Sequence, residues 1–142
     1  MRYLYVLLIL VMAGCTYPKD PENSWEKAKV TGLKVGISEN PPYTTFADGK
    51  AGGMEVDMLR KFAKSENLKI EFKKGSESDL VEEMEKYELH VIAGGFTKKT
   101  IWKKKAGPTA PYDKNHVFLV PKGENRLLQH LETFIFHKIK NK

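Results

Sequence analysis

The chain has 142 residues, of which 41% are hydrophobic and 30% are charged, a composition typical of a globular protein rather than a disordered one. Its 24 Lys and Arg residues against 18 Asp and Glu residues give a formal net charge of +6. The lysines are scattered, and the only dense run is Lys103–Lys105, so the charge does not predict a nucleic-acid-binding surface. On an exported protein, this excess would meet anionic lipid, wall polymer or an anionic ligand.

Residues 1–14 are predicted to form a cleavable signal peptide. Arg2 supplies a positive start, and the apolar run Tyr3–Met12 is shorter than the roughly 20 residues that a membrane span needs. The stretch Val11–Cys15 resembles the bacterial lipobox, in which the cysteine is lipid-modified and becomes the new N-terminus. An ordinary secretory signal with an incidental cysteine is the alternative, but Cys15 is the only cysteine in the chain and stands where cleavage would fall. We therefore expect a lipoprotein on the periplasmic side of an outer membrane or the outer face of a cell membrane.

Residues 15–31 are predicted to be the lipidated cysteine followed by a tether. The segment is largely polar and contains Pro18 and Pro21, whereas Trp25 is a candidate for docking on the domain. Residues 32–142 are predicted to form one domain of ordinary size.

Within this domain, segments whose apolar residues have the spacing of a strand are followed by segments whose apolar residues have the spacing of a helix. Strands are expected at 33–37, 68–72, 90–94 and 116–120, and helices at 54–67, 76–87 and from 124 onward. The last helix is amphipathic, with Leu127, Leu131 and Ile135 on one side. The alternation of strand and helix predicts an α/β fold in three layers, with a mostly parallel sheet flanked by helices.

Ligands bind such sheets beyond the carboxyl ends of the strands, which here selects the loops 39–46, 74–76 and 94–97. Tyr43 and Phe46 can cover a ligand there, or their rings can pack into the edge of the sheet. Gly95 and Thr97 can present N–H groups to an anion, or the glycines can serve only a tight turn. Both alternatives stay open from the sequence.

No catalytic chemistry is expected. The four histidines lack metal-ligand spacing, and the chain contains no Ser–His–acid pattern, phosphate-binding loop or dinucleotide motif. Glu55 and Asp57 lie two positions apart, and on a helix such side chains point in different directions. The prediction is a protein that is not an enzyme and uses no metal and no cofactor.

Residues Leu33–Tyr112 resemble the first lobe of family 3 extracellular solute-binding proteins, the amino-acid-binding components of ABC importers. The matching pieces are, in chain order, Leu33–Ser38, Pro41–Tyr43 with Phe46, Gly53–Asp57, Ser78–Leu80, Val91–Thr97 and Thr109–Tyr112. The resemblance implies one lobe of a periplasmic-binding-protein type II fold. It also implies a ligand site lined by Tyr43, Phe46, Gly95 and Thr97, with Trp102 as a stacking wall.

Two departures from the family pattern bear on function. Trp102 occupies the position of the arginine that grips an amino acid's carboxylate, and an indole N–H cannot replace a charged fork, although Lys98, Lys99 and Lys103 stand nearby. The second lobe is also missing, so we expect a complete one-lobe protein whose half-site a permease or a second protomer would complete. The expected function is binding of an amino acid or similar small polar solute, anionic solutes included, for an ABC transporter. The alternative is a non-transport interaction or sensory lipoprotein with a vestigial site.

Overall fold

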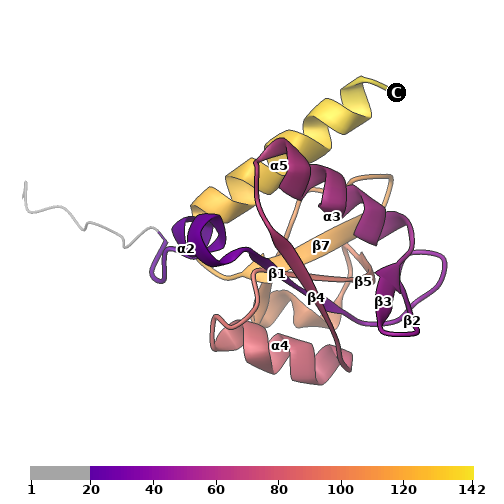
Figure 1. Ribbon diagram of the computed structural model, residues 1–142, viewed down its shortest axis with the longest axis horizontal. Coiled ribbons are helices and arrows are strands. Elements are labelled where there is room, and N and C mark those ends of the chain that lie inside the picture. Colours follow the sequence, from indigo (N-terminus) through magenta and orange to yellow (C-terminus); the bar gives the residue numbers. More distant parts are fainter. Residues whose placement is uncertain (1–19) are drawn as a thin grey trace, which may run out of the picture.

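A five-stranded sheet runs through the middle of the molecule in the computed structural model, which describes residues 20–142 (Figure 1). Its strands lie in the order β4-β1-β5-β7-β6. Their bounds are Leu33–Ile37 for β1, Ile70–Lys74 for β4, Val91–Thr97 for β5, Ala106–Pro108 for β6 and His116–Pro121 for β7. The predicted signal peptide, the lipidation at Cys15 and the start of the predicted tether lie outside the described residues.

The sheet is parallel on one side and antiparallel on the other. Strands β4, β1 and β5 run parallel, joined by α3 (Met54–Ser65) and α4 (Glu77–Glu85). Strand β7 pairs antiparallel with both β5 and β6. The chain reaches β7 through the 3-10 turn η1 (Ile101–Lys104) and β6, without the α-helical crossover usual between parallel strands. The α/β lobe is confirmed, and its sheet is mixed.

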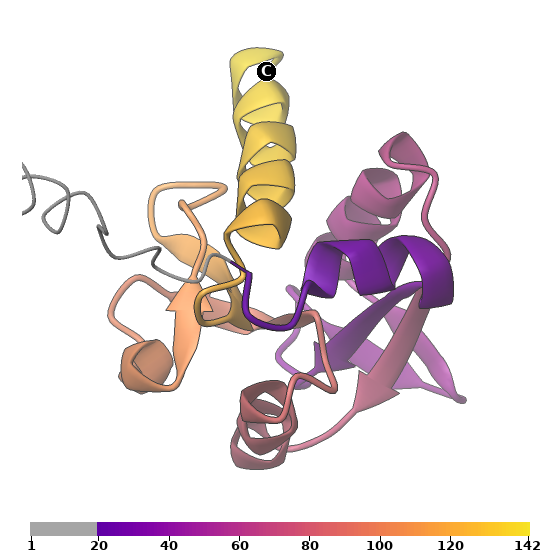
Figure 2. The same ribbon diagram turned by 90° about the vertical axis from the view of Figure 1, so that its left-hand side faces the viewer.

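Helices cover both faces of this sheet, which confirms the three layers (Figures 1 and 2). On one face, α3 and the last helix α5 (Asn125–Lys140) enclose a core that contains Phe62, Phe118 and Leu131. On the other face, α4 packs Leu80 and Met84 against the sheet. Neighbouring residues of β7 point into different cores because side chains alternate along a strand.

The loop after β1 contains a hairpin that was not predicted. Strands β2 (Thr45–Ala47) and β3 (Lys50–Gly52) pair antiparallel around Asp48 and Gly49, whose φ angles are 52° and 72°. Two positive φ angles in a two-residue turn match the twist of a hairpin, and Asp-Gly favours that turn. The hairpin projects beside the carboxyl ends of the parallel strands (Figure 1).

Part of the segment predicted as a tether is a helix, α2 (Ser24–Thr31), packed on the domain. Trp25 is only 5% exposed and stacks on His130 of α5 with ring centroids 3.8 Å apart, which confirms its docking. Ala28 is fully buried one turn further along α2. The domain therefore begins well before residue 32. None of the helices within residues 20–142 combines the length and hydrophobicity of a membrane span.

Candidate solute-binding site

The three loops selected from the sequence meet at one edge of the sheet, which we call the carboxyl edge: the end where β1, β4 and β5 finish. Asn40 donates from its side-chain amide to the Gly94 carbonyl at 3.0 Å, joining the loop after β1 to the last part of β5, where the structure has strand at the predicted loop 94–97. Lys74 at the end of β4 forms an ion pair with Glu39 at 2.8 Å. The structure thus brings the loops together as the parallel-strand rule predicts.

Of the two predicted aromatic residues, Tyr43 lies closer to the centre of this edge. Its partly exposed ring lies over Gly95, where a Cβ atom would come within 2.7 Å of the ring. Its centroid is 4.4 Å from the His116 imidazole. Phe46 is half-buried and packs against the main core, which is the alternative considered for it. A ligand at this edge would contact Tyr43 before Phe46.

The backbone N–H of Gly95 is already paired inside the protein. Gly95 has φ +64°, and its N–H donates to Glu55 Oε2 at 3.1 Å. The other oxygen of Glu55 accepts from the Tyr112 hydroxyl at 2.6 Å. The anion that this N–H meets is therefore the protein's own carboxylate, which lies directly beneath the predicted site.

Glu55 is fully buried, and sequence reasoning missed it. Burial raises the pKa of this carboxyl above its ordinary value, although the hydrogen bonds from Tyr112 and Gly95 act in the opposite direction. As expected, Asp57 points elsewhere and forms an exposed ion pair with Arg60. The available signal was the spacing of Glu55 with Leu59 and Phe62, because positions i, i+4 and i+7 share the inner face of a helix.

Trp102 lies on the side of the edge toward α4, whereas Thr97 lies where β5 meets β7. Thr97 ends β5 and pairs with His116 of β7. Trp102 packs partly against the core beneath α4, and its indole N–H donates to Glu77 Oε2 at 2.8 Å. This hydrogen bond ties η1 to α4, and the role of Trp102 as a stacking wall stays a prediction.

His116 is a second residue of this edge that the sequence did not reveal. Because β7 runs antiparallel, its first residue lies beside the last residue of β5. The His116 ring lies between Tyr43 and Tyr112, and its Nδ1 is 2.8 Å from Asp113 Oδ2. Burial alone would raise the pKa of Asp113, but hydrogen bonds from Asn115 N–H, His116 N–H and the His116 ring hold it below its ordinary value. An acidic group thus stands next to the aromatic rings.

Within residues 20–142, no group of three His, Cys, Asp or Glu side chains lies close enough together to hold a metal ion. The carboxyl edge instead offers rings, a partly exposed glycine backbone and charged side chains of both signs. Such a set can recognise a small polar molecule through its apolar surface and its charged groups.

The comparisons with known proteins agree with this geometry. Residues 33–141 match the model of the bacterial extracellular solute-binding proteins, family 3. The membrane-bound lytic murein transglycosylase F of Vibrio cholerae is 32% identical over 116 residues, which cover 78% of this chain and 22% of that protein. Its counterpart from Vibrio parahaemolyticus is 29% identical over 123 residues, covering 83% and 23%. The chain therefore spans less than a quarter of the length of these curated relatives.

Solved structures share the fold at lower sequence identity. The arginine-bound form of domain 1 of the T. maritima arginine-binding protein superposes with a TM-score of 0.70 at 21% identity, covering 78% of this chain and 97% of that one. An ancestral cationic amino acid solute-binding protein gives a TM-score of 0.74 at 13% identity, covering 82% and 93%. With the family model matched from the first strand of the sheet to the end of α5, the chain belongs to the family 3 bacterial extracellular solute-binding proteins.

Proposed function

We propose that this chain is an extracytoplasmic solute-binding lobe, anchored to a membrane by a lipid on Cys15 after removal of residues 1–14. It binds a small polar solute of the amino-acid kind at the carboxyl edge and acts by binding, not by catalysis. The observation that carries the proposal is the partly exposed Tyr43 ring over Gly95, with His116 and Asp113 beside it.

A single lobe is sufficient to hold a solute in one protein of this fold. Domain 1 of the T. maritima arginine-binding protein has an arginine-bound form without its second domain, and it superposes on this chain. Half a cleft buries less of a ligand than a closed pocket, which usually buries about 70–90% of it. We therefore expect weak binding by the isolated chain, strengthened when a partner protein or a second protomer covers the edge.

The charged groups at the edge favour a solute with a cationic end. The Gly95 N–H is paired with Glu55, and the Trp102 indole is paired with Glu77, so neither is free to grip a carboxylate. The Tyr43 face suits an ammonium or guanidinium group, and the Asp113 carboxylate, which already pairs with Asn115 and His116, adds negative charge beside it. Arginine, lysine and ornithine are the first solutes to test, and glutamate is the matched anionic control.

Isothermal titration of residues 16–142 against these solutes tests the proposal. We expect arginine or lysine to bind more tightly than glutamate, and Tyr43→Ala to weaken binding by an order of magnitude. Phe46→Ala is the matched control, because its half-buried ring packs against the core. No heat and no thermal shift at millimolar concentrations of any of these solutes would rule out the solute-binding role.

A second candidate is a non-transport lobe that senses or docks a component of the cell envelope. It is favoured by the curated relatives, which are membrane-bound lytic murein transglycosylases rather than importers. Purification of the chain from detergent-solubilised membranes separates the two candidates. ABC permease subunits should co-purify with a transport protein, whereas their absence together with retained wall fragments or wall enzymes supports the second candidate.

A further inference from the structure

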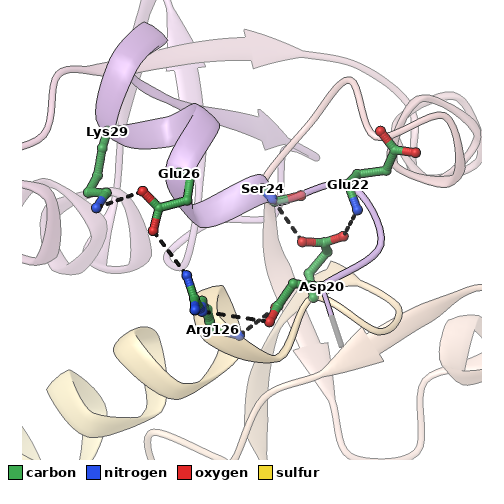
Figure 3. A network of polar contacts seen from close by, with 7 residues as sticks. Asp20, Glu22, Ser24, Glu26, Lys29 and Arg126 are labelled. Carbon is green, nitrogen blue, oxygen red and sulfur yellow. Dashed lines mark hydrogen bonds and ion pairs between the residues drawn. The ribbon is translucent and has the colours of Figure 1, made fainter. Parts of the chain in front are cut away.

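A buried carboxylate near the end of the chain caps the helix at its beginning. Glu124 is 1% exposed, and its two oxygens accept from Glu22 N–H and Ser24 N–H, each at 2.8 Å (Figure 3 shows these bonds). Ser24 begins α2, whose own N-cap, Asn23, makes no side-chain capping bond. Glu124 thus supplies acceptors that the first turn of a helix otherwise lacks.

The arrangement is reciprocal, because the beginning of the described chain also caps α5. Asp20 Oδ1 accepts from Arg126 N–H in the first turn of α5 at 2.7 Å, whereas the α5 N-cap residue makes no capping bond with its side chain. Asp20 N–H donates to the Gly123 carbonyl at 3.1 Å. The Arg126 guanidinium adds ion pairs to Asp20 and Glu26 (Figure 3). We call these cross-caps between Asp20–Ser24 and Gly123–Arg126 the clasp.

The clasp lies at the end of the sheet opposite to the solute site. It joins the turn after β7 to the segment that leads through α2 into β1, so it stands where β1 begins and β7 ends. Tyr43 lies beyond the other end of β1, and Thr97 is the last residue of β5. Figure 1 shows α2 and the β2–β3 hairpin on opposite sides of the domain. We call the end that carries the clasp the amino edge.

Cys15 precedes Asp20 by five residues, and five residues of backbone reach at most about 18 Å. A domain of this size has a radius of gyration of about 14 Å, and is therefore about 35 Å across. A lipid on Cys15, as the proposed function requires, would hold the amino edge near the bilayer. The linking chain is too short to pass around the domain while the clasp stays closed.

We propose that the clasp fixes the orientation of the lipid-anchored domain. The amino edge faces the membrane, and the solute site faces away from it. Solutes and partners then reach Tyr43 from the side opposite the anchoring membrane. A permease in the same bilayer would meet α2 and the turn at Lys122 instead of the site. This orientation fits the second candidate function better than direct delivery to such a permease.

Lysine footprinting on vesicles tests this orientation. The acylated chain is reconstituted in vesicles and treated with a membrane-impermeant succinimidyl ester, alongside the unacylated chain in solution. Lys29 and Lys122 lie at the amino edge, Lys98 and Lys99 lie at the carboxyl edge, and all four are exposed. We expect the first pair to react several-fold more slowly on vesicles and the second pair to react equally in both states. Equal protection of the two pairs, or protection of Lys98 and Lys99 alone, would overturn the proposal.

Two variants test whether the short link and the clasp cause the orientation. A ten-residue Gly-Ser insertion between Lys19 and Asp20 extends the reach to about 50 Å and should abolish the protection without touching the folded domain. Glu124→Ala should do the same by releasing α2, whereas Glu82→Ala on the exposed face of α4 should leave the protection unchanged. If Lys29 and Lys122 stay protected after the insertion, the short link does not set the orientation and the proposal is contradicted.

The proposal can fail separately from the proposed function. Mass spectrometry of the chain purified from membranes shows whether Cys15 carries acyl groups. If it does not, the proposed anchor is wrong, and the chain starting at Cys15 is coupled through its thiol to a maleimide-bearing lipid for the same footprinting. The solute titration is independent of both results, because it uses a chain that lacks Cys15.

Discussion

Two buried glutamates at opposite edges of the sheet show how one residue type serves two purposes. Glu124 at the amino edge and Glu55 at the carboxyl edge are 1% and 0% exposed, and each accepts two hydrogen bonds. The donors to Glu124 are the backbone N–H groups of Ser24, the first residue of α2, and of Glu22 just before it, where the helix dipole favours negative charge. The donors to Glu55 are one backbone N–H and the Tyr112 hydroxyl, in surroundings where burial raises the pKa of the carboxyl.

The difference indicates that Glu124 holds distant segments together at the amino edge, whereas Glu55 at the carboxyl edge can change its protonation state. Glu124 fastens segments 100 and 102 positions apart in the sequence. Glu55 instead holds the Gly95 backbone beneath Tyr43 with a group that can gain a proton when its surroundings change.

Removal of the Glu124 carboxylate should have the largest effect on stability. Glu124→Ala leaves the N–H groups of Glu22 and Ser24 without their acceptors. An unsatisfied buried group such as the Ser24 N–H costs about 1–3 kcal/mol, and the N–H of the exposed Glu22 costs less because water can reach it. We expect the free energy of unfolding to fall by about 2–5 kcal/mol, measured by urea denaturation of residues 16–142. Trp25 fluorescence should report the loosened α2. A loss of stability below about 1 kcal/mol would show that Glu124 does not hold α2 to the rest of the domain.

Substitution of Glu55 should have a smaller effect on stability, and this effect should depend on pH. Glu55→Gln keeps one acceptor but turns an N–H toward a donor, so we expect a loss of about 1–3 kcal/mol at neutral pH. The raised pKa of Glu55 means that the folded protein takes up a proton before the unfolded chain does as the pH falls. This group therefore adds stability on acidification toward 4.5, its ordinary pKa, and the glutamine cannot.

The measurement is the difference in unfolding free energy between the wild type and Glu55→Gln from pH 7 to 4.5. We expect the gap to widen as the pH falls. Asp57→Asn, on the exposed side of the same helix, should give no such trend. A gap that narrows on acidification would contradict the assignment of a raised pKa to Glu55.

His90 at the amino edge provides a titration of opposite sign. Its buried ring accepts Lys34 N–H at 2.9 Å, and burial together with Lys34 and Lys27 lowers its pKa to about 4. The unfolded chain therefore binds the proton first, and stability falls between pH 6.5 and about 4 by at most about 1.4 kcal/mol per pH unit. His90→Asn, which retains an acceptor, should remove this slope in denaturation measurements at several pH values; an unchanged slope would exclude His90 as its source.

The smallest effect is expected for an exposed carboxylate at the carboxyl edge. The hydrogen bond from Lys74 is the main cause that holds the pKa of Glu39 below its ordinary value, with a smaller contribution from Phe46 N–H. Lys74→Ala should raise the pKa of Glu39 toward its ordinary value, as followed by NMR of the carboxyl carbon, without a measurable change in stability. An unchanged pKa would show that this pair does not persist in solution.

Much of the fold could be predicted because its elements carry local patterns. The alternation in β1 and the amphipathic spacing of α5 need no distant information, and neither does the cap of α4, where Ser76 accepts from Asp79 N–H. Helix α2 escaped prediction because its capping acceptor comes from Glu124, about a hundred positions away. The direction of β7 escaped because a strand pattern does not encode which way the strand runs.

The candidate site divides in the same way. The loops that hold Tyr43 and Gly95 follow from the rule for parallel strands, and the structure places them together. His116 could not be placed without the antiparallel direction of β7. The burial of Glu55 was not predicted, because charged residues are rarely buried unless they are paired, and its partner Tyr112 lies 57 positions away.

The clasp also sets the order in which the molecule can assemble during synthesis. Helix α2 is among the first segments to be made, yet the carboxylate that caps it and the ring on which Trp25 stacks belong to Glu124 and His130. Contacts this distant along the chain form late and slow folding. Until α5 emerges, the nascent chain cannot close its amino edge, so the domain reaches its final form only after the residues of α5 have been released.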